Sequence, residues 1–270
     1  MGETADQLRA VLAAHASPAL RATIEPLIQP AIAIEPTALA DDLDAAMDSL
    51  ALGASRFGGI PDLPPGAAWP ARDDVPMEFV AQVRLADVAP LDARWPARGS
   101  LLFFYNSQHH VTDQGVAHCC AVLYHAGPDA ELVRTPPPFI DFRGEYEDGP
   151  RRAPWIHGIA SLAFTATDSA PSGPSPWLEG ELLGEWQDFL YEHGDAWLPR
   201  VDHRLLGYAN AGDWVDAHAN GTADQLLFQV QGDEHCFTWG DVYDRLYFFI
   251  TAAELAARDF SHARLHSRMG

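Results

Sequence analysis

The fold is decided by the strand that reads Gly99-Ser100-Leu101-Leu102-Phe103-Phe104-Tyr105, because the chain contains a second version of it, Asp244-Arg245-Leu246-Tyr247-Phe248-Phe249-Ile250. Each version follows a strand that carries a glutamine, Phe79-Val80-Ala81-Gln82-Val83 in the first half and Leu226-Leu227-Phe228-Gln229-Val230 in the second. Each glutamine strand follows a glycine turn, which is Gly58-Gly59 or Leu206-Gly207-Tyr208. Three features in the same order predict an internal duplication.

The spacing of the repeated features supports this interpretation. Gln82 and Phe104 are 22 positions apart, and Gln229 and Phe249 are 20 positions apart. Aromatic strands resemble one another, so chance similarity is the alternative. We predict an α+β fold in which two diverged repeats of mostly antiparallel β-sheet pack together, with N-terminal helices and a helix between the repeats. The seam between the repeats is then the first place to expect a pocket.

The predicted organisation is a single globular domain over residues 1–270. A helical N-terminal segment covers residues 1–53, the first β-rich repeat covers residues 54–165, and a helix with the second β-rich repeat covers residues 179–260. The boundary near residue 54 is where helical periodicity gives way to short apolar runs broken by Gly and Pro.

The first forty residues predict two helices and a short strand. Leu8, Val11 and Leu12 have helical spacing, and Ser17 followed by Pro18 is the pattern of a helix cap and first turn. Residues 31–34 form an apolar run between prolines, which favours a short strand.

A third helix is predicted to begin at a Thr37 cap and to end near Gly53. Its apolar positions are Leu39, Leu43, Met47 and Leu50, and its acidic positions are Asp41, Asp42, Asp44 and Asp48. Since the acidic positions lie off the apolar face, we expect them to be exposed to solvent.

The rest of the chain reads as strands with two helices. The first glutamine strand alternates, which predicts Phe79, Ala81, Val83 and Leu85 on one face. Further strands are predicted over residues 100–105, 117–125, 161–165, 226–231, 236–239 and 246–250, whereas residues 133–142 are broken by prolines, as is typical of an edge strand or loop. Helices are predicted over residues 179–192, ended by Gly194, and over residues 252–258.

The charge balance argues against two classes of partner. Seventeen Lys+Arg against thirty-eight Asp+Glu give a net charge of −21. Nucleic-acid binding requires cationic side chains that displace counterions from phosphates, so we expect no nucleic-acid partner, and an anionic membrane is repelled in the same way. A field of this sign attracts basic partners. General acidity of the source proteome is the alternative explanation.

The cysteines and the N-terminus indicate a cytoplasmic protein. Adjacent residues of a strand point to opposite faces, so Cys119 and Cys120 are poorly placed to form a disulfide, and Cys236 makes the number odd. This favours a reducing compartment. The first residues show no basic region followed by an apolar run, so we predict no signal peptide, and no stretch approaches the roughly 20 apolar residues of a membrane span.

Taken together, several segments resemble the YwqG-like family, a bacterial domain of unknown function. The segments are Phe57-Gly58-Gly59-Ile60-Pro61-Asp62-Leu63-Pro64, Trp69-Pro70, residues 77–83, residues 99–104, residues 203–208, residues 226–230, Trp239-Gly240-Asp241 and residues 246–250. They span most of residues 55–260. The resemblance implies an α+β fold with duplicated sheet units and implies no catalytic residue. Gln231-Gly232-Asp233 and Ala209 depart from the family pattern, which usually has an Asp-Ser-Asp-like turn and a proline there.

Seven residues are candidates for ligand binding: Gln82, His203, Tyr208, Gln229, Trp239, Asp241 and Arg245. Asp241 could act as a general base or cation ligand, and Arg245 could clamp an anion. Gln82 and Gln229 occupy equivalent positions and could present two amides to one ligand. The structural alternatives are a tight turn at Asp241 and buried glutamine amides that bond to neighbouring backbone groups.

Familiar catalytic and metal motifs are missing from the sequence. Gly-x-Ser-x-Gly and His-Glu-x-x-His are absent, and the loop 57–65 lacks the pattern of a phosphate-binding or dinucleotide-binding turn. His109-His110, His118-Cys119-Cys120 and Glu234-His235-Cys236 offer zinc-type ligands without the spacing of a structural zinc site. We therefore predict no cofactor and no metal, with a metal site assembled across strands as the alternative.

The leading hypothesis is a non-enzymatic binding or interaction protein in the bacterial cytoplasm, for example an immunity-type protein that masks a basic partner. It rests on the acidic charge, the duplicated sheets and the lack of a catalytic signature. One alternative is an enzyme or small-molecule binder that uses the seam between the repeats and the seven candidate residues. The other is a metal-binding protein, which elemental analysis of the purified chain would test.

Overall fold

The computed structural model describes residues 5–106, 119–142, 151–171, 178–197, 203–209, 224–232 and 245–268. The chain is α+β, with few helices and a large, mostly antiparallel β-sheet, as predicted. The predicted strand over residues 236–239 and the candidates Trp239 and Asp241 lie outside the described residues. Among the described helices, none combines the length and the apolar character that crossing a membrane requires.

The helices are mostly short. They are α1 (Ala5–His15), α2 (Pro18–Ile24), α3 (Leu43–Asp48), α4 (Leu85–Val88), α5 (Glu181–Trp197) and α7 (Ala252–Ala257), with 3-10 turns η1 (Glu25–Leu27) and η2 (Asp129–Glu131). The long strands are β1 (Gln29–Ala38), β6 (Glu78–Arg84), β7 (Ser100–Tyr105), β8 (Cys120–His125), β12 (Ala160–Ser169), β14 (Asp224–Gln231), β15 (Arg245–Thr251) and β16 (Arg264–Arg268). The short strands are β2 (Arg56–Phe57), β3 (Asp62–Leu63), β4 (Ala71–Arg72), β5 (Val75–Pro76), β9 (Val133–Arg134), β10 (Ile140–Phe142), β11 (Arg151–Ala153) and β13 (Arg204–Leu205).

The chain divides into two compact units whose segments interleave along the sequence. Unit 1 is made of Met1–Ile34, Phe164–Val230 and Tyr247–Ala253, and unit 2 of Glu35–Ala163, Gln231–Leu246 and Glu254–Gly270. The boundaries fall inside β1, β12, β14, β15 and α7, so each of these elements contributes residues to both units.

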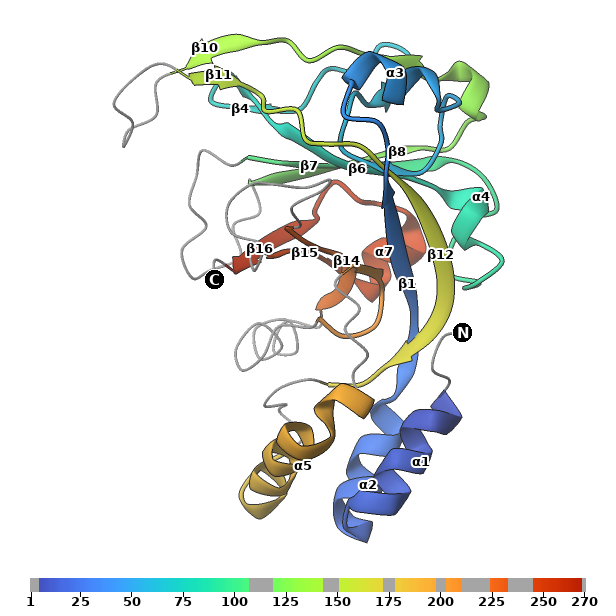
Figure 1. Cartoon of the computed structure of the whole chain (residues 1–270), viewed down its shortest axis with the longest axis vertical. Helices are drawn as coiled ribbons and strands as arrows, with labels where there is room; N and C mark the ends of the chain where they lie inside the picture. Colours follow the sequence, from blue (N-terminus) through green and yellow to red (C-terminus); the bar gives the residue numbers. More distant parts are fainter. Residues whose placement is uncertain are drawn as a thin grey trace. The chain divides into compact units, whose positions relative to one another are not determined.

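The sheet of unit 1 has the strand order β15-β14-β13-β1-β12. The short strand β13 is antiparallel to both of its neighbours: Leu205 faces Ile32 of β1 on one side and Phe228 of β14 on the other. Figure 1 shows β1 and β12 as two long strands that run side by side. Phe228 and Phe248 stack with ring centroids 5.6 Å apart, so aromatic packing joins β14 to β15.

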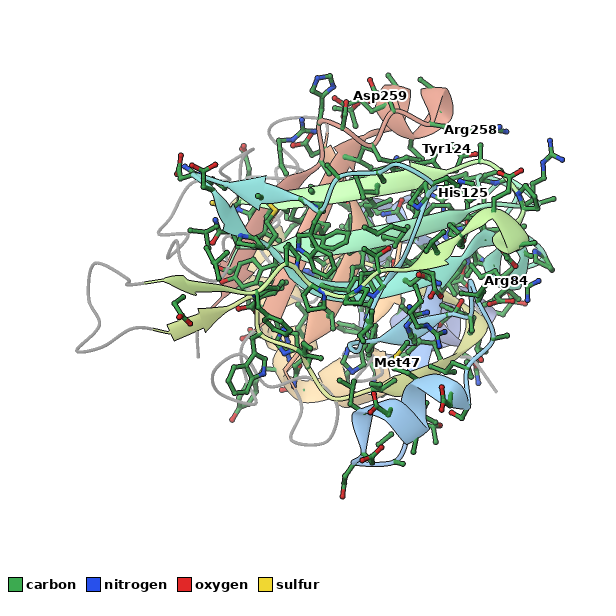
Figure 2. All side chains as sticks on the ribbon, turned by 90° about the horizontal axis from the view of Figure 1, so that it is seen from above. Met47, Arg84, Tyr124, His125, Arg258 and Asp259 are labelled. Carbon is green, nitrogen blue, oxygen red and sulfur yellow. The ribbon has the colours of Figure 1, made fainter. Side chains whose placement is uncertain are left out.

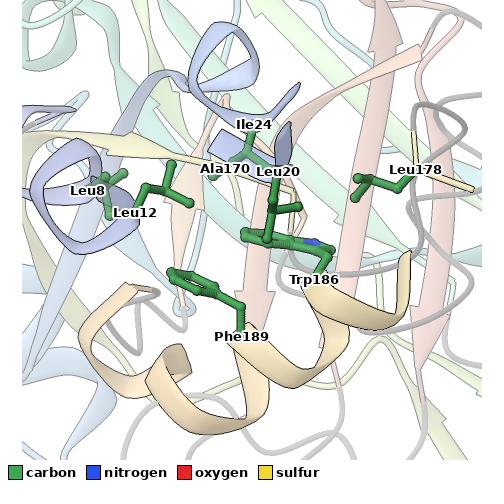
Figure 3. Packing of buried hydrophobic residues seen from close by; sticks show 8 residues of the cluster. All are labelled: Leu8, Leu12, Leu20, Ile24, Ala170, Leu178, Trp186 and Phe189. Carbon is green, nitrogen blue, oxygen red and sulfur yellow. The ribbon is translucent and has the colours of Figure 1, made fainter. Parts of the chain in front are cut away.

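The helices of unit 1 pack on one apolar cluster. The buried members of this cluster are Leu8, Leu12, Leu20, Ile24, Ala170, Leu178, Trp186 and Phe189. Figure 3 shows Trp186 and Phe189 of α5 pointing toward the leucines of α1 and α2. Ser17 caps α2 by accepting a bond from the Leu20 N–H at 3.1 Å, as predicted, and its own N–H and hydroxyl both donate to Glu185 of α5 at 2.8 Å.

The sheet of unit 2 has the strand order β12-β2-β6-β7-β8. The predicted strand over residues 100–105 is confirmed as β7, and all six of its residues are buried. Phe79 and Phe104 lie across from each other with ring centroids 5.5 Å apart, in a cluster with Leu63, Met77 and Leu102. Aromatic side chains from adjacent strands therefore build the core of this unit.

The prediction that Phe79, Ala81, Val83 and Leu85 share one face is wrong. The β6–β7 register shifts between Phe79 and Ala81, so Phe79 faces Phe104 while Ala81 faces Phe103. Phe103 and Phe104 point to opposite faces of β7, so this β-bulge places Phe79 and Ala81 on opposite faces of the sheet. Leu85 lies beyond the strand, at the start of α4.

The start of the third helix was also predicted wrongly. Thr37 belongs to β1, where its carbonyl accepts a bond from the Ser161 hydroxyl at 3.4 Å. Asp42 caps α3 instead, because its side chain accepts the Ala45 N–H at 2.8 Å. The expectation of solvent-exposed acidic positions is confirmed, since Asp41, Asp42, Asp44 and Asp48 are all exposed.

Other predicted boundaries differ by a few residues. The helix predicted over residues 179–192 is α5, and it continues through Gly194, which is not among the glycines in the left-handed region and so does not end the helix. The strand predicted over residues 161–165 is longer, as β12. The strand β16 after α7 was not predicted, and the segment 133–142 contains only the short strands β9 and β10.

Candidate functional site

In each unit a buried arginine faces a buried glutamine across two strands. Arg56 of β2 lies opposite Gln82 of β6 in unit 2, and Arg204 of β13 lies opposite Gln229 of β14 in unit 1. Each of the four side chains is exposed by 4% or less. A buried guanidinium needs a bonding partner for each of its donors, so these four residues are the natural start of a search for a polar site.

The same turn follows both arginines. Two successive residues are left-handed: Gly58 and Gly59 with φ of 60° and 71° in unit 2, and Leu206 and Gly207 with φ of 62° and 74° in unit 1. The first of the two donates its N–H to the glutamine strand, from Gly58 to the Val80 carbonyl at 3.0 Å and from Leu206 to the Leu227 carbonyl at 3.3 Å. The turn therefore fixes each arginine strand against its glutamine strand.

In unit 2, Arg56, Gln82, Asp62 and Arg134 form what we call the Asp62 cluster. Asp62 Oδ2 accepts three bonds, from Gly53 N at 2.9 Å, from Arg56 Nη1 at 3.0 Å and from Gln82 Nε2 at 3.3 Å. Arg134 Nε donates to Oδ1 at 3.1 Å. The Asp62 N–H in turn donates to Gln82 Oε1 at 3.1 Å. Both carboxylate oxygens are thus occupied by donors.

The arginines of the Asp62 cluster also bind backbone carbonyls of the surrounding loops. Arg56 donates to Ala54 at 3.1 Å and to Ile60. Arg134 donates to Met47 at 2.7 Å and to Leu50 at 3.2 Å, at the end of α3. The Arg56 guanidinium lies 5.7 Å from the centre of the Phe79 ring, a cation–π distance. The cluster therefore ties α3, the loop 53–62 and β9 to the glutamine strand.

Electrostatics keep Asp62 ionised. Burial acts to raise the pKa of Asp62, but the Arg56 charge, the Gly53 N–H and Arg134 together outweigh it, so this pKa lies below its ordinary value. A carboxylate that is ionised and fully bonded cannot serve as a general base or bind a metal without breaking the cluster. Asp62 therefore has a structural role. Gln82 is a buried glutamine whose amide bonds to neighbouring backbone groups, which is the structural alternative given for it above.

Glu78 and His157 form the second buried polar pair of unit 2. His157 Nε2 lies 3.1 Å from Glu78 Oε2, and the two residues are exposed by 2% and 6%. Carboxylate–imidazole pairs perform proton transfer in many enzymes, and the same pair also fixes segments in place. Here the backbone of His157 accepts the Gly59 N–H at 3.1 Å. The pair therefore joins β6 to the segment that crosses the left-handed turn.

The two described cysteines are buried thiols with separate surroundings. Cys119 Sγ accepts a bond from Arg72 at 3.1 Å, whereas Cys120 Sγ lies 3.4 Å from the Ala263 carbonyl. Both are free cysteines, and Cys119 directly precedes β8, whose first residue is Cys120. Burial raises the pKa of both thiols, and that of Cys120 to about 12, so neither is a ready nucleophile.

The remaining candidates from the sequence occupy different places. In unit 1, the His203 carbonyl accepts the Ile34 N–H at 3.0 Å, and the Tyr208 N–H donates to the Ser169 hydroxyl at 3.0 Å. Tyr208 also accepts a bond at its carbonyl from Arg204 Nη1 at 3.0 Å, within the turn that faces Gln229. In unit 2, Arg245 Nε donates to Gln231 Oε1 at 2.6 Å. A ligand pocket at the seam of the repeats stays a prediction.

Arg56, Arg134 and Asp62 are not predicted from the sequence as members of a polar cluster. A signal for Arg56 exists, because Arg56-Phe57-Gly58-Gly59 and Arg204-Leu205-Leu206-Gly207 both read Arg-x-x-Gly, with each arginine two residues before a left-handed pair. Arg134 is 72 residues from Asp62, and no local pattern connects them.

The part of the chain that the structure describes contains no group of three His, Cys, Asp or Glu side chains arranged to hold a metal ion. His109, His110, His118, His235 and Cys236 lie outside it, so the metal-site hypothesis for those residues stays a prediction.

A known protein family matches most of the chain. The model of the family described as "Domain of unknown function (DUF1963)" matches residues 55–267, and the chain belongs to this family. No curated protein matches the chain. The matched range contains both Arg–Gln pairs and the whole Asp62 cluster.

Proposed function

We propose that this DUF1963 protein is a binding protein that offers an acidic surface to a basic protein partner, as an immunity-type protein does. The observation that carries the proposal is the way the chain uses its cations. All seventeen basic side chains are arginines, and lysine is absent. Arginine is the residue suited to fixed, bidentate pairing, whereas lysine presents a mobile charge to solvent.

Most of the described arginines are paired with carboxylates of the same chain. The pairs are Arg9–Asp6, Arg21–Glu25, Arg56–Asp62, Arg72–Asp73, Arg84–Asp129, Arg94–Asp92, Arg134–Asp62 and Arg264–Glu254. These pairs engage eight arginines with carboxylates of the same chain, and the net charge stays at −21. The excess of acidic residues is therefore left to act on molecules in solution.

Part of that excess is concentrated at α3. Asp41, Asp44 and Asp48 are exposed within eight positions, and Asp42 is exposed while it caps the helix. The C-terminal end of α3 is fixed in place, because Arg134 donates hydrogen bonds to the carbonyls of Met47 and Leu50. Fixed charges lose little entropy when a partner binds, which favours specific association over diffuse attraction.

We also infer that the sheet units are diverged copies. The support is the matching of local geometry: Arg56 with Gln82 and Arg204 with Gln229 in the same cross-strand position, each followed by two left-handed residues. Further support comes from the equivalent N–H bonds of Gly58 and Leu206. The YwqG-like assignment, a bacterial source and a cytoplasmic location remain predictions.

Affinity capture tests the proposed function. The immobilised chain is exposed to cell extract at about 50 mM and about 500 mM salt, a change that strongly shortens the range of electrostatic attraction. The control is the triple variant Asp41→Asn, Asp44→Asn, Asp48→Asn, which keeps the Asp42 cap. We expect a basic protein that is retained at low salt, released at high salt and reduced in the variant. Captured proteins no more basic than the extract would contradict the proposal.

A further inference from the structure

The strand β8 is an edge of the sheet in unit 2. It pairs with β7 through a continuous antiparallel register, from Ser100↔His125 to Tyr105↔Cys120, and β8 is the last strand in the order. Figure 2 marks Tyr124 and His125 at one end of this strand. An edge strand carries a row of backbone N–H and C=O groups that its own sheet leaves unpaired.

The register identifies the unpaired groups. The Asn106 N–H donates to the Cys119 carbonyl at 2.9 Å, so these two residues form a hydrogen-bonded pair of the ladder. Hydrogen-bonded and non-hydrogen-bonded pairs alternate along an antiparallel ladder. Ala121, Leu123 and His125 therefore bond to β7, whereas the backbone groups of Cys120, Val122 and Tyr124 point away from it. Within the described residues these outward backbone groups have no hydrogen-bond partner.

This edge lacks the protection that proteins usually give to an edge strand. Prolines, lysines and β-bulges are the common devices, and Cys120-Ala121-Val122-Leu123-Tyr124-His125 contains none of them. The strand is also held firmly: Val122 is buried, and the Tyr124 ring packs on Phe260 with centroids 5.4 Å apart. Among the residues that the structure describes, this edge is regular and unpaired, and such an edge is a template for the addition of another strand.

Charge selects the occupant. The exposed carboxylates of Glu131 and Asp259 lie near the His125 end of β8, since Glu131 Oε2 is 3.9 Å from His125 Nε2 and Asp259 directly precedes Phe260. Arg72 lies at the opposite end, where it donates to Cys119 Sγ at 3.1 Å. A second copy of the chain would bring another net charge of −21 to this edge. A strand with arginine or lysine side chains is attracted instead. We propose that an extended basic segment of a partner protein adds to β8 as a further strand, an inference that rests on the proposed function.

Amide hydrogen exchange of the full chain tests the inference. The probe is a short peptide of alternating arginine and valine, and the control is a peptide of the same length with glutamate in place of arginine. In the free protein we expect the Val122 and Tyr124 amides to exchange faster than those of Ala121 and Leu123. The arginine peptide should slow Val122 and Tyr124 exchange by about tenfold or more, and the glutamate peptide should leave it unchanged.

A pair of matched variants separates strand addition from simple charge attraction. Val122→Pro removes an outward N–H that β7 does not use, whereas Val122→Thr keeps the N–H and the branched shape. We expect Val122→Pro to weaken binding of the arginine peptide by roughly tenfold or more and Val122→Thr to bind as the natural chain does. If Val122→Pro does not fold, the exchange measurement on the unaltered chain decides.

The outcomes distinguish this inference from the proposed function. Binding of the arginine peptide without protection of Val122 and Tyr124 overturns strand addition and leaves the acidic binding function standing. No binding of the arginine peptide at low salt contradicts both. Protection that depends on protein concentration, with a dimer in sedimentation, shows that a second copy occupies the edge and overturns the basic partner. Slow exchange of Val122 and Tyr124 in the free chain shows that the edge is already covered.

Discussion

The turn after Arg56 in unit 2 and the turn after Arg204 in unit 1 have the same backbone but different sequences. Gly58 and Leu206 occupy the same left-handed position. A Cβ atom on Gly58 would lie 2.0 Å from the Gly158 carbonyl oxygen, so no side chain fits there. Leu206 instead carries a fully buried side chain. A left-handed position therefore requires glycine only where another backbone segment crosses it, and the φ angle alone costs about 1–2 kcal/mol.

The arginine of each turn is held by bonds close to that turn. In unit 2 the guanidinium of Arg56 forms an ion pair with Asp62, and in unit 1 the guanidinium of Arg204 donates to the Tyr208 carbonyl of its own turn. The ion pair gives unit 2 a buried charge balance that a single substitution can destroy. Changes at Asp62, Gly58, Gly59 and Leu206 therefore test how far the likeness between the two turns extends.

The largest expected effect follows Asp62→Ala. This change leaves the cations of Arg56 and Arg134 without their carboxylate, and removal of one partner from a buried ion pair costs about 3–5 kcal/mol. The free energy of unfolding is measured by denaturant titration, with Asp44→Ala on the exposed face of α3 as the control. A loss below about 1 kcal/mol would show that solvent or another carboxylate compensates the arginines.

A smaller loss is expected for Gly58→Ala. The new Cβ meets the Gly158 carbonyl, a backbone atom that cannot move aside cheaply, so we expect a loss of roughly 3 kcal/mol. Gly59→Ala is the matched control, because the atoms nearest to its Cβ belong to the side chains of Met47 and Ile159 and not to the backbone, with a predicted loss of about 1–2 kcal/mol. Equal losses in thermal or denaturant unfolding would mean that φ, and not the crossing backbone, makes Gly58 necessary.

Acid tests the charge of the same turn. The folded-state pKa of Asp62 lies below its unfolded value, so the stability contributed by this carboxylate is present above about pH 4 and is lost as the pH falls through the folded pKa. Each unit of pKa difference corresponds to about 1.4 kcal/mol. The free energy of unfolding should therefore fall less steeply below pH 4 in Asp62→Asn than in the natural chain. Parallel pH profiles would contradict this assignment.

The smallest effect isolates backbone strain in unit 1. Leu205 and Leu206 are both fully buried, but only Leu206 is left-handed. Glycine at position 206 removes the buried apolar side chain but also relieves the backbone strain of the left-handed conformation. Glycine at position 205 removes a buried side chain and relieves no such strain. We expect Leu205→Gly to destabilise by roughly 1–2 kcal/mol more than Leu206→Gly, measured side by side by denaturant titration. The opposite order would show that Leu206 packing outweighs its strain.

Local patterns in the sequence were enough to predict much of the fold. The Ser17-Pro18 cap, the strand over residues 100–105 and the exposed acidic residues of α3 all follow from side chains that interact with near neighbours. The Thr37 cap failed because Ser161 of β12 holds Thr37 in a strand, a contact 124 residues away. The prediction of a shared face in β6 was wrong for a related reason, because the β-bulge is a register shift that exists only relative to the partner strand.

The Asp62 cluster was beyond sequence reasoning for the same reason. Gln82 was singled out because a polar residue interrupts an apolar strand, and that signal is local. Its partners come from three other segments, with Asp62 20 residues away and Arg134 further along on β9. A single sequence contains no signal that connects such distant positions. The Arg-x-x-Gly pattern shared by the two turns, in contrast, can be recognised in the sequence once the strand pairing is known.

The interleaving of the two units also constrains how the chain is made. Unit 1 includes Tyr247–Ala253 and unit 2 includes Glu254–Gly270, so neither unit has all its segments until nearly the whole chain has been synthesised. Proteins of several domains usually fold from the N-terminus while translation continues. Here the last segments of both units must leave the ribosome before either unit is complete. An incomplete unit exposes apolar surface, which promotes aggregation before synthesis ends.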